Sequence, residues 1–261
     1  GAFITSILIS FLVGPKLIQY FKVKQKLGQP IRDDGPKWQI EAKKGTPTMG
    51  GALILFALTI SVIMWTDLFN IYLWLVLFIT LSFGLIGFID DYNKIKSNSS
   101  NGLKAVTRII LQIFFALMIS ILVINNLDDR INTTISFPFF KNLIVNFGYF
   151  YLIISLFIIV GSANSVNLTD GLDGLAIVPV MIVAMTFAFI AYVSGNIVFS
   201  DYLLINYIPG TGELSVLCGA LIGAALGFLW FNAPPAKVFM GDTGSLALGA
   251  TIGSIAIMVK H

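Results

Sequence analysis

Apolar stretches alternate with short polar connections along the whole sequence, and this alternation predicts a bundle of membrane-spanning helices. Each stretch approaches the roughly 20 residues that an α-helix needs to cross a bilayer. We therefore expect an all-α polytopic membrane protein with eight transmembrane helices, near residues 1–21, 49–66, 72–89, 107–124, 147–163, 174–194, 213–231 and 244–259. The connection at 125–146 is long enough for a β-hairpin or a surface helix.

The composition excludes a soluble domain. Of the 261 residues, 57% are hydrophobic and only 11% are charged, with a mean hydropathy of +0.90, whereas about a quarter of the residues in ordinary domains are charged. A single cysteine, Cys218, excludes a disulfide framework within the chain. The net charge of +3 is too small to indicate a nucleic-acid partner. We treat residues 1–261 as one integral membrane domain.

Basic residues are distributed unevenly over the connections, and this sets the expected orientation. Thirteen of the 16 lysines and arginines lie in or beside the connections at 22–48, 90–106, 164–173 and 232–243. The positive-inside rule places these connections in the cytoplasm and the N-terminus outside. Lys104 and Arg108, which flank the fourth span, are expected to face lipid headgroups.

Three of the connections assigned to the cytoplasm carry acidic motifs. They are "DD" at Asp90 and Asp91, "NLTDGLDG" with Asp170 and Asp173, and "VFMGDTGS" with Asp242. Glycine lets the backbone approach phosphate closely, and carboxylates bind Mg²⁺ together with substrate phosphates. A single such motif is equally typical of a helix cap. Three on one face favour a Mg²⁺–diphosphate site.

Other motifs supply a second aspartate pair for comparison and three further candidate binding residues. The pair Asp128 and Asp129, on the opposite face, has Arg130 alongside and no glycine-rich neighbour, so we interpret it as a solvated loop. In "KKGTPTMGG", Lys44 is as consistent with phosphate binding as with membrane anchoring. In "WFNAPPAKVF", Asn232 precedes a proline-rich break and Phe239 follows it. Phe239 can stack on a base or simply pack against the protein.

Four motifs follow one another along the chain: "KKGTPTMGG", "GFIDDYNK", "NSVNLTDGLDGLA" and "FNAPPAKVFMGDTGSLALG". Together the four motifs resemble those of the bacterial phospho-N-acetylmuramoyl-pentapeptide transferases, within the wider family of polyprenyl-phosphate sugar-1-phosphate transferases. The resemblance covers essentially the whole chain. It implies a Mg²⁺-dependent enzyme of the bacterial cytoplasmic membrane that acts on UDP-N-acetylmuramoyl-pentapeptide and undecaprenyl phosphate, releases UMP and forms the first lipid intermediate of peptidoglycan.

The resemblance also implies roles for individual residues. Asp90 and Asp91 would be the acidic pair near the lipid phosphate, with Asp90 favoured as the base and a covalent phospho-aspartyl route left open. Asp242 would be a catalytic Mg²⁺ ligand. The substrate-binding residues would be Lys44, Asn167, Asp170, Asp173, Asn232 and Phe239.

The sequence departs from the family pattern at its C-terminal end. The family has ten spans and a His-rich motif between the last two. This chain stops before that motif, and its only histidine, His261, is not part of it. We therefore expect a fragment that holds the first eight spans, weak or inactive by itself.

The alternatives are a UDP-N-acetylglucosamine:polyprenyl-phosphate transferase, a transporter with midplane carboxylates, and a structural membrane protein. The oligomeric state, a homodimer included, stays open.

Overall fold

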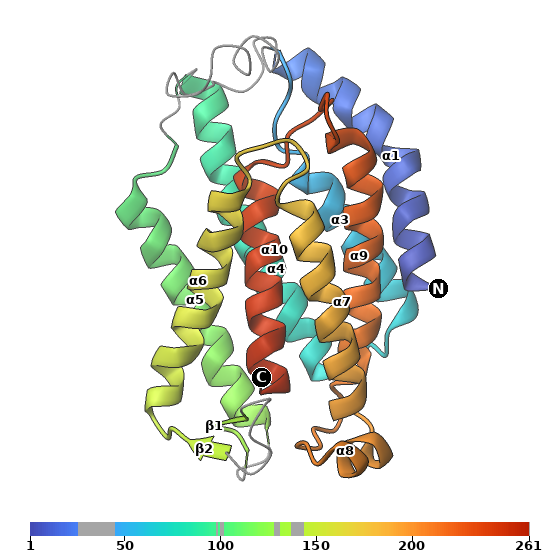
Figure 1. Cartoon of the computed structure of the whole chain (residues 1–261). Coiled ribbons are helices and arrows are strands. Elements are labelled where there is room, and N and C mark those ends of the chain that lie inside the picture. The colour runs from blue at the N-terminus through green and yellow to red at the C-terminus, as the bar shows by residue number, and fades with distance from the viewer. Residues whose placement is uncertain (26–44, 98, 100–101, 128–130, 137–143, 261) are drawn as a thin grey trace.

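A computed structural model describes residues 1–25, 45–97, 99, 102–127, 131–136 and 144–260. Within these residues the chain forms an elongated helical bundle (Figure 1). The helices are α1 (Ala2–Lys24), α3 (Gly51–Trp65), α4 (Ile71–Ser97), α5 (Ala105–Asn126), α6 (Phe150–Thr169), α7 (Ile177–Ser194), α8 (Ile197–Leu203), α9 (Glu213–Asn232) and α10 (Gly241–Val259). Strands β1 (Thr134–Ser136) and β2 (Ile144–Asn146) pair antiparallel, so the hairpin considered for the 125–146 connection is present.

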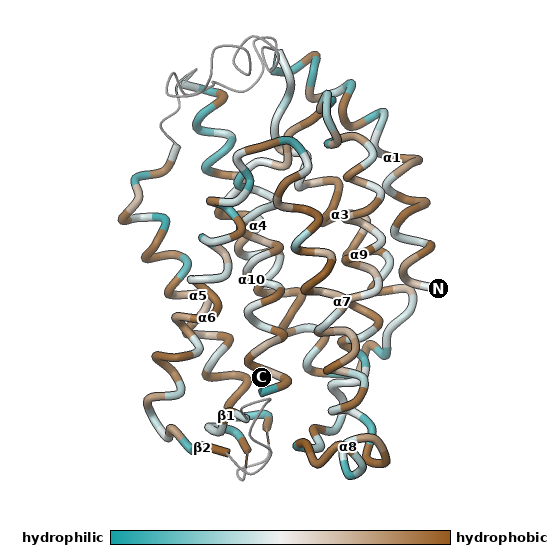
Figure 2. Tube along the Cα trace, viewed as in Figure 1, coloured by the Kyte–Doolittle hydropathy of each residue, from teal (hydrophilic) through white to brown (hydrophobic). Residues whose placement is uncertain are grey.

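Eight of these helices coincide with the eight expected spans. Among the described residues, seven are long and apolar enough to cross a bilayer, and the protein is a multi-pass membrane protein. The exception is α3, whose 15 residues extend only about 22 Å, less than the hydrocarbon core of a bilayer. Hydrophobic residues dominate the middle of the bundle and hydrophilic residues gather towards its ends (Figure 2).

Helix α10 forms the centre of the bundle, and 94% of its most apolar 18-residue stretch is buried. It packs against α4 and α6 and also contacts α3, α5 and α7 (Figure 1). Small residues allow this close packing. A Cβ atom at Gly87 of α4 would overlap the backbone carbonyl of Asp242, so only glycine lets α4 approach the first turn of α10 this closely.

Helix α4 continues beyond the expected end of its span. The apolar run ends at Ile89, but the helix continues to Ser97 and therefore includes Asp90 and Asp91. The C-terminal part of α4, the first turn of α10 and the C-terminal part of α6 meet at one end of the bundle, which we call the acidic end because it holds Asp90, Asp91 and Asp242. The hairpin and α8 lie at the opposite end (Figure 1).

Candidate active site

Three carboxylates that are far apart in the sequence converge at the acidic end. Asp90 and Asp91 come from α4 and Asp242 comes from the first turn of α10, and one oxygen of each lies within 4.8 Å of the others. Asp90 and Asp91 are each only 1% exposed. The expected convergence of the "DD" and "VFMGDTGS" motifs is therefore present in the fold.

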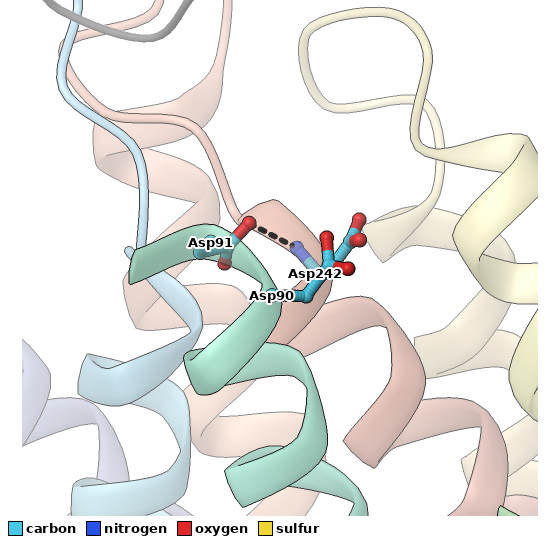
Figure 3. A group of neighbouring side chains, drawn as sticks. All are labelled: Asp90, Asp91 and Asp242. Carbon is cyan, nitrogen blue, oxygen red and sulfur yellow. Dashed lines mark hydrogen bonds between the residues drawn. The ribbon is translucent and has the colours of Figure 1, made fainter. Parts of the chain in front are cut away.

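Asp91 holds the beginning of α10. Its Oδ1 accepts a hydrogen bond from the backbone N–H of Asp242 at 3.2 Å (Figure 3). Its Oδ2 accepts from the Thr243 backbone N–H at 3.0 Å and from the Thr243 hydroxyl at 2.8 Å. The first N–H groups of a helix have no partner within the helix, and a carboxylate there is favoured by the helix dipole. Asp91 thus fixes the helix turn from which Asp242 projects.

Asp90 points to a different set of partners. Its Oδ1 accepts from the backbone N–H of Leu103 at 2.7 Å, and its Oδ2 lies 2.6 Å from the Lys94 ammonium, one helical turn further along α4. Adjacent helical residues point about 100° apart. The two neighbouring aspartates therefore have different partners, and of the two only Asp91 accepts hydrogen bonds from backbone N–H groups of α10.

Asp242 is surrounded by hydrogen-bond donors. Its Oδ2 lies 2.8 Å from Lys94 Nζ and 3.4 Å from Arg108 Nη1. Its Oδ1 accepts from the Asn167 amide of α6 at 2.7 Å, and the same amide donates to the Ser245 hydroxyl at 2.8 Å. The expectation that Arg108 faces lipid headgroups is wrong, because its guanidinium turns inward to Asp242. Three carboxylates and two cations leave this cluster with a formal charge of −1.

A second group of residues ties the α6–α7 connection to the connection before α10. Asn232, 3% exposed, accepts from the Gly174 backbone N–H at 2.9 Å and donates to the Val238 carbonyl at 3.0 Å. Asp173 accepts from the Ala236 backbone N–H at 3.4 Å. Asp170 is partly buried in the same connection. In the described geometry Asn232 therefore positions two loops, and its role towards a substrate stays a prediction.

The "GTPTMGG" segment lies alongside the third acidic motif. The Phe239 N–H donates to the Pro47 carbonyl at 2.9 Å, and the Gly50 N–H donates to the Phe239 carbonyl at 2.8 Å. This backbone pairing explains why α3 begins only at Gly51 and is shorter than a full span. Phe239 itself is partly exposed. Lys44 lies outside the described residues.

The donor set fits a divalent cation such as Mg²⁺, which prefers carboxylate oxygens. Asp90 and Asp242 are the best-placed ligands, because the Asp91 oxygens are already bonded to α10. The Lys94 ammonium, 2.6 and 2.8 Å from these two carboxylates, shows that a cation can be held between them. Sequence reasoning missed Lys94, although its position four residues after Asp90 is the spacing of a helical ion pair.

Comparisons with known proteins show which family the chain resembles. A model of glycosyl transferase family 4 matches residues 73–260, and a phospho-N-acetylmuramoyl-pentapeptide-transferase signature matches residues 43–55. A phospho-N-acetylmuramoyl-pentapeptide-transferase from Rhodopseudomonas palustris (strain BisB18) is 53% identical over 262 residues, which cover 100% of this chain and 72% of that protein. The matched signature spans the segment that pairs with Phe239.

Proposed function

Because the chain belongs to the phospho-N-acetylmuramoyl-pentapeptide-transferase family, we propose that it serves the transfer of phospho-N-acetylmuramoyl-pentapeptide from its UDP carrier to undecaprenyl phosphate. A phosphate oxygen of the lipid attacks the sugar-linked phosphorus of the diphosphate. The bond to the bridging oxygen breaks and UMP leaves. The observation that carries the proposal is the convergence of Asp90, Asp91 and Asp242 beside the family signature segment.

Reaction between two anions requires positive charge and alignment more than covalent chemistry. Mg²⁺ held by Asp242 and Asp90 would neutralise the charge that develops on the phosphate oxygens. Lys94 and Arg108 are the described cations of the cluster and add positive charge on the same side. Asn167 holds the Asp242 carboxylate in orientation from α6.

The two aspartates of α4 take different parts in this proposal. Of the two, Asp90 is the group that we propose removes the last proton of the lipid phosphate, because both oxygens of Asp91 are already bonded to the first turn of α10. Asp91 contributes by holding the start of α10 and hence the position of Asp242. A covalent phospho-aspartyl route would also start from Asp90.

The remaining expected residues belong to the nucleotide side of the reaction. Asp170 and Asp173 would line the uridine-diphosphate pocket, with Asn232 and Phe239 near the nucleoside. Their connections meet at the acidic end through the contacts of Asn232 and Asp173. Lys44, which lies outside the described residues, is proposed as a further substrate-binding residue.

The lipid has a suitable approach from the membrane. An apolar cleft of about 470 Å³ runs between α6 and α7, from Phe157 to Thr169, with Ile252 of α10 behind it. The same helix α6 carries Asn167, which contacts Asp242. With the acidic end in the cytoplasm of a bacterial inner membrane, as the basic connections favour, both substrates would reach the carboxylates from the side on which the nucleotide is made.

The test is a substrate comparison with the full-length protein. Purified protein, undecaprenyl phosphate and Mg²⁺ are mixed with either UDP-N-acetylmuramoyl-pentapeptide or UDP-N-acetylglucosamine, and UMP release and the lipid product are measured. The proposal expects turnover of the muramoyl substrate alone. Turnover of UDP-N-acetylglucosamine instead would establish the sister activity, and transport of an ion or sugar without UMP release would indicate a transporter.

A further inference from the structure

Lys94 is the residue of the acidic cluster that the proposed chemistry explains least. Its ammonium lies 2.6 Å from Asp90 Oδ2 and 2.8 Å from Asp242 Oδ2, and so bridges α4 to α10. The side chain is 19% exposed, whereas that of Asp90 is 2% exposed. A part-exposed ammonium therefore sits at the outer boundary of a largely buried pair of carboxylates.

The ammonium and a divalent cation need the same two oxygens. Mg²⁺ binds oxygen at roughly 2.0–2.1 Å and requires near-octahedral geometry. An ammonium between those oxygens leaves no place for the metal there. Without any cation, the Asp90 and Asp242 carboxylates would repel each other in a region poorly screened by water. A cation that contacts both carboxylates removes this repulsion, as Lys94 does here.

The chain around Lys94 allows the exchange. Lys94 lies in the last turn of α4, which ends at Ser97. Its ammonium is carried on a flexible four-carbon stem. Arg108 is less suited to the exchange, because its guanidinium contacts Asp242 alone of the two carboxylates, at 3.4 Å.

We propose that Lys94 is an exchangeable counter-ion of the acidic cluster, which holds Asp90 and Asp242 together until a divalent cation displaces it. The released ammonium then faces the diphosphate and helps to neutralise it. The inference rests on the proposed function for this second step only. The first step concerns metal binding by the folded protein and can be measured without any substrate.

Removing the ammonium should change metal binding and turnover in opposite directions. A ligand binds more weakly when only a fraction of the molecules has its site open, in proportion to that fraction. Lys94→Met should therefore bind Mn²⁺ about tenfold more tightly if Lys94 leaves the site open in roughly one molecule in ten. The value of kcat for UMP release should fall. Mn²⁺ binding is followed by the electron paramagnetic resonance signal of the free ion, with full-length protein in detergent.

Three further variants make the outcome decisive. Lys96→Met removes an exposed charge two residues along the same helix and should leave Mn²⁺ affinity within about twofold. An equal gain in Lys96→Met would overturn the proposal in favour of a general field effect. Weaker Mn²⁺ binding in both Lys94→Met and Lys94→Gln, the second serving if the first folds poorly, would mean that Lys94 only supports the structure. The gain should vanish when Asp242→Asn is added. If wild-type protein binds Mn²⁺ but releases no UMP, the proposed function is wrong. The Mn²⁺ affinities of the variants still test whether the metal displaces Lys94.

Discussion

Helix α10 has a lysine beside each of its ends, and the two lysines have opposite surroundings. At the acidic end, Lys94 touches two carboxylates. At the opposite end, Lys260 follows the last residue of α10 and donates to neutral acceptors, the Asn132 carbonyl at 2.6 Å and the Tyr151 hydroxyl at 2.7 Å. Its ammonium also lies 3.9 Å from the centre of the Tyr151 ring. Lys260 is the more deeply buried of the two lysines and has neutral partners, whereas the partners of Lys94 are charged.

Both ends also follow the electrostatics of a helix. Anions are favoured at a helix N-terminus and cations at a C-terminus. Asp91 and Asp242 lie at the beginning of α10, and Lys260, directly after its end, matches this rule only while it is protonated. The Ser136 N–H of the hairpin donates to the Lys260 carbonyl at 3.0 Å, which attaches the hairpin to this end. We propose ion exchange at the acidic end, whereas the contacts at the opposite end attach connections to α10.

The largest effect should come from removing the charge of Asp242. In Asp242→Asn the carboxylate that Lys94, Arg108 and Asn167 share becomes a neutral amide. Metal-dependent UMP release should fall by about a thousandfold or more, since losses of that order follow the removal of one strong electrostatic contact. The matched control is Asp128→Asn, whose position lies outside the described residues, and which should change little. Near-normal activity of folded Asp242→Asn protein would remove Asp242 from the metal site.

A methyl group added where α4 contacts α10 should cause a smaller loss of activity than Asp242→Asn. In Gly87→Ala the new Cβ overlaps the Asp242 carbonyl. Forced separation of α4 and α10 should cost about 1–3 kcal/mol of unfolding free energy. A shift of the carboxylates by about 1 Å should lower kcat roughly a hundredfold. Gly219→Ala of α9 is the control, because no heavy atom lies within 4 Å of its new Cβ. Equal behaviour of the two variants in thermal unfolding and UMP release would mean that the α4–α10 contact is not critical.

The smallest effect should appear at Lys260, as a pH dependence of stability. Burial lowers the pKa of Lys260 to about 7, from 10.5. Between these values the unfolded chain holds the proton and the folded protein does not, so stability should rise with pH from about 7 to about 10.5. The contribution should be on the order of 1–3 kcal/mol. Melting temperatures at pH 7 and pH 9.5 measure it. A rise of the same size in Lys260→Met would assign the dependence to other groups.

Hydropathy alone predicted the eight helices that correspond to the expected spans, but not α8, because a bilayer leaves few alternatives to an apolar run. It did not predict the short α3, whose start is set by backbone bonds between 47–51 and 239–240. The motifs predicted that Asp90, Asp91 and Asp242 share one end. They could not assign Asp91 to the first turn of α10, because that contact joins residues 151 apart in sequence. They also gave Arg108 the wrong surroundings, since a basic residue at a span end faces lipid or protein according to the helix's rotation.

The most direct test of the account is to locate the metal. Spin labels are attached to Lys96→Cys at the acidic end and to Tyr202→Cys at the opposite end, where Tyr202 is 83% exposed; the native Cys218 is buried. The two ends are separated by the length of α10, about 28 Å. If the metal binds at the acidic end, bound Mn²⁺ speeds relaxation of the label at position 96 much more strongly than at position 202, and Asp242→Asn abolishes the difference. Stronger relaxation at position 202, or an effect at position 96 that survives Asp242→Asn, would contradict a metal site at the acidic end.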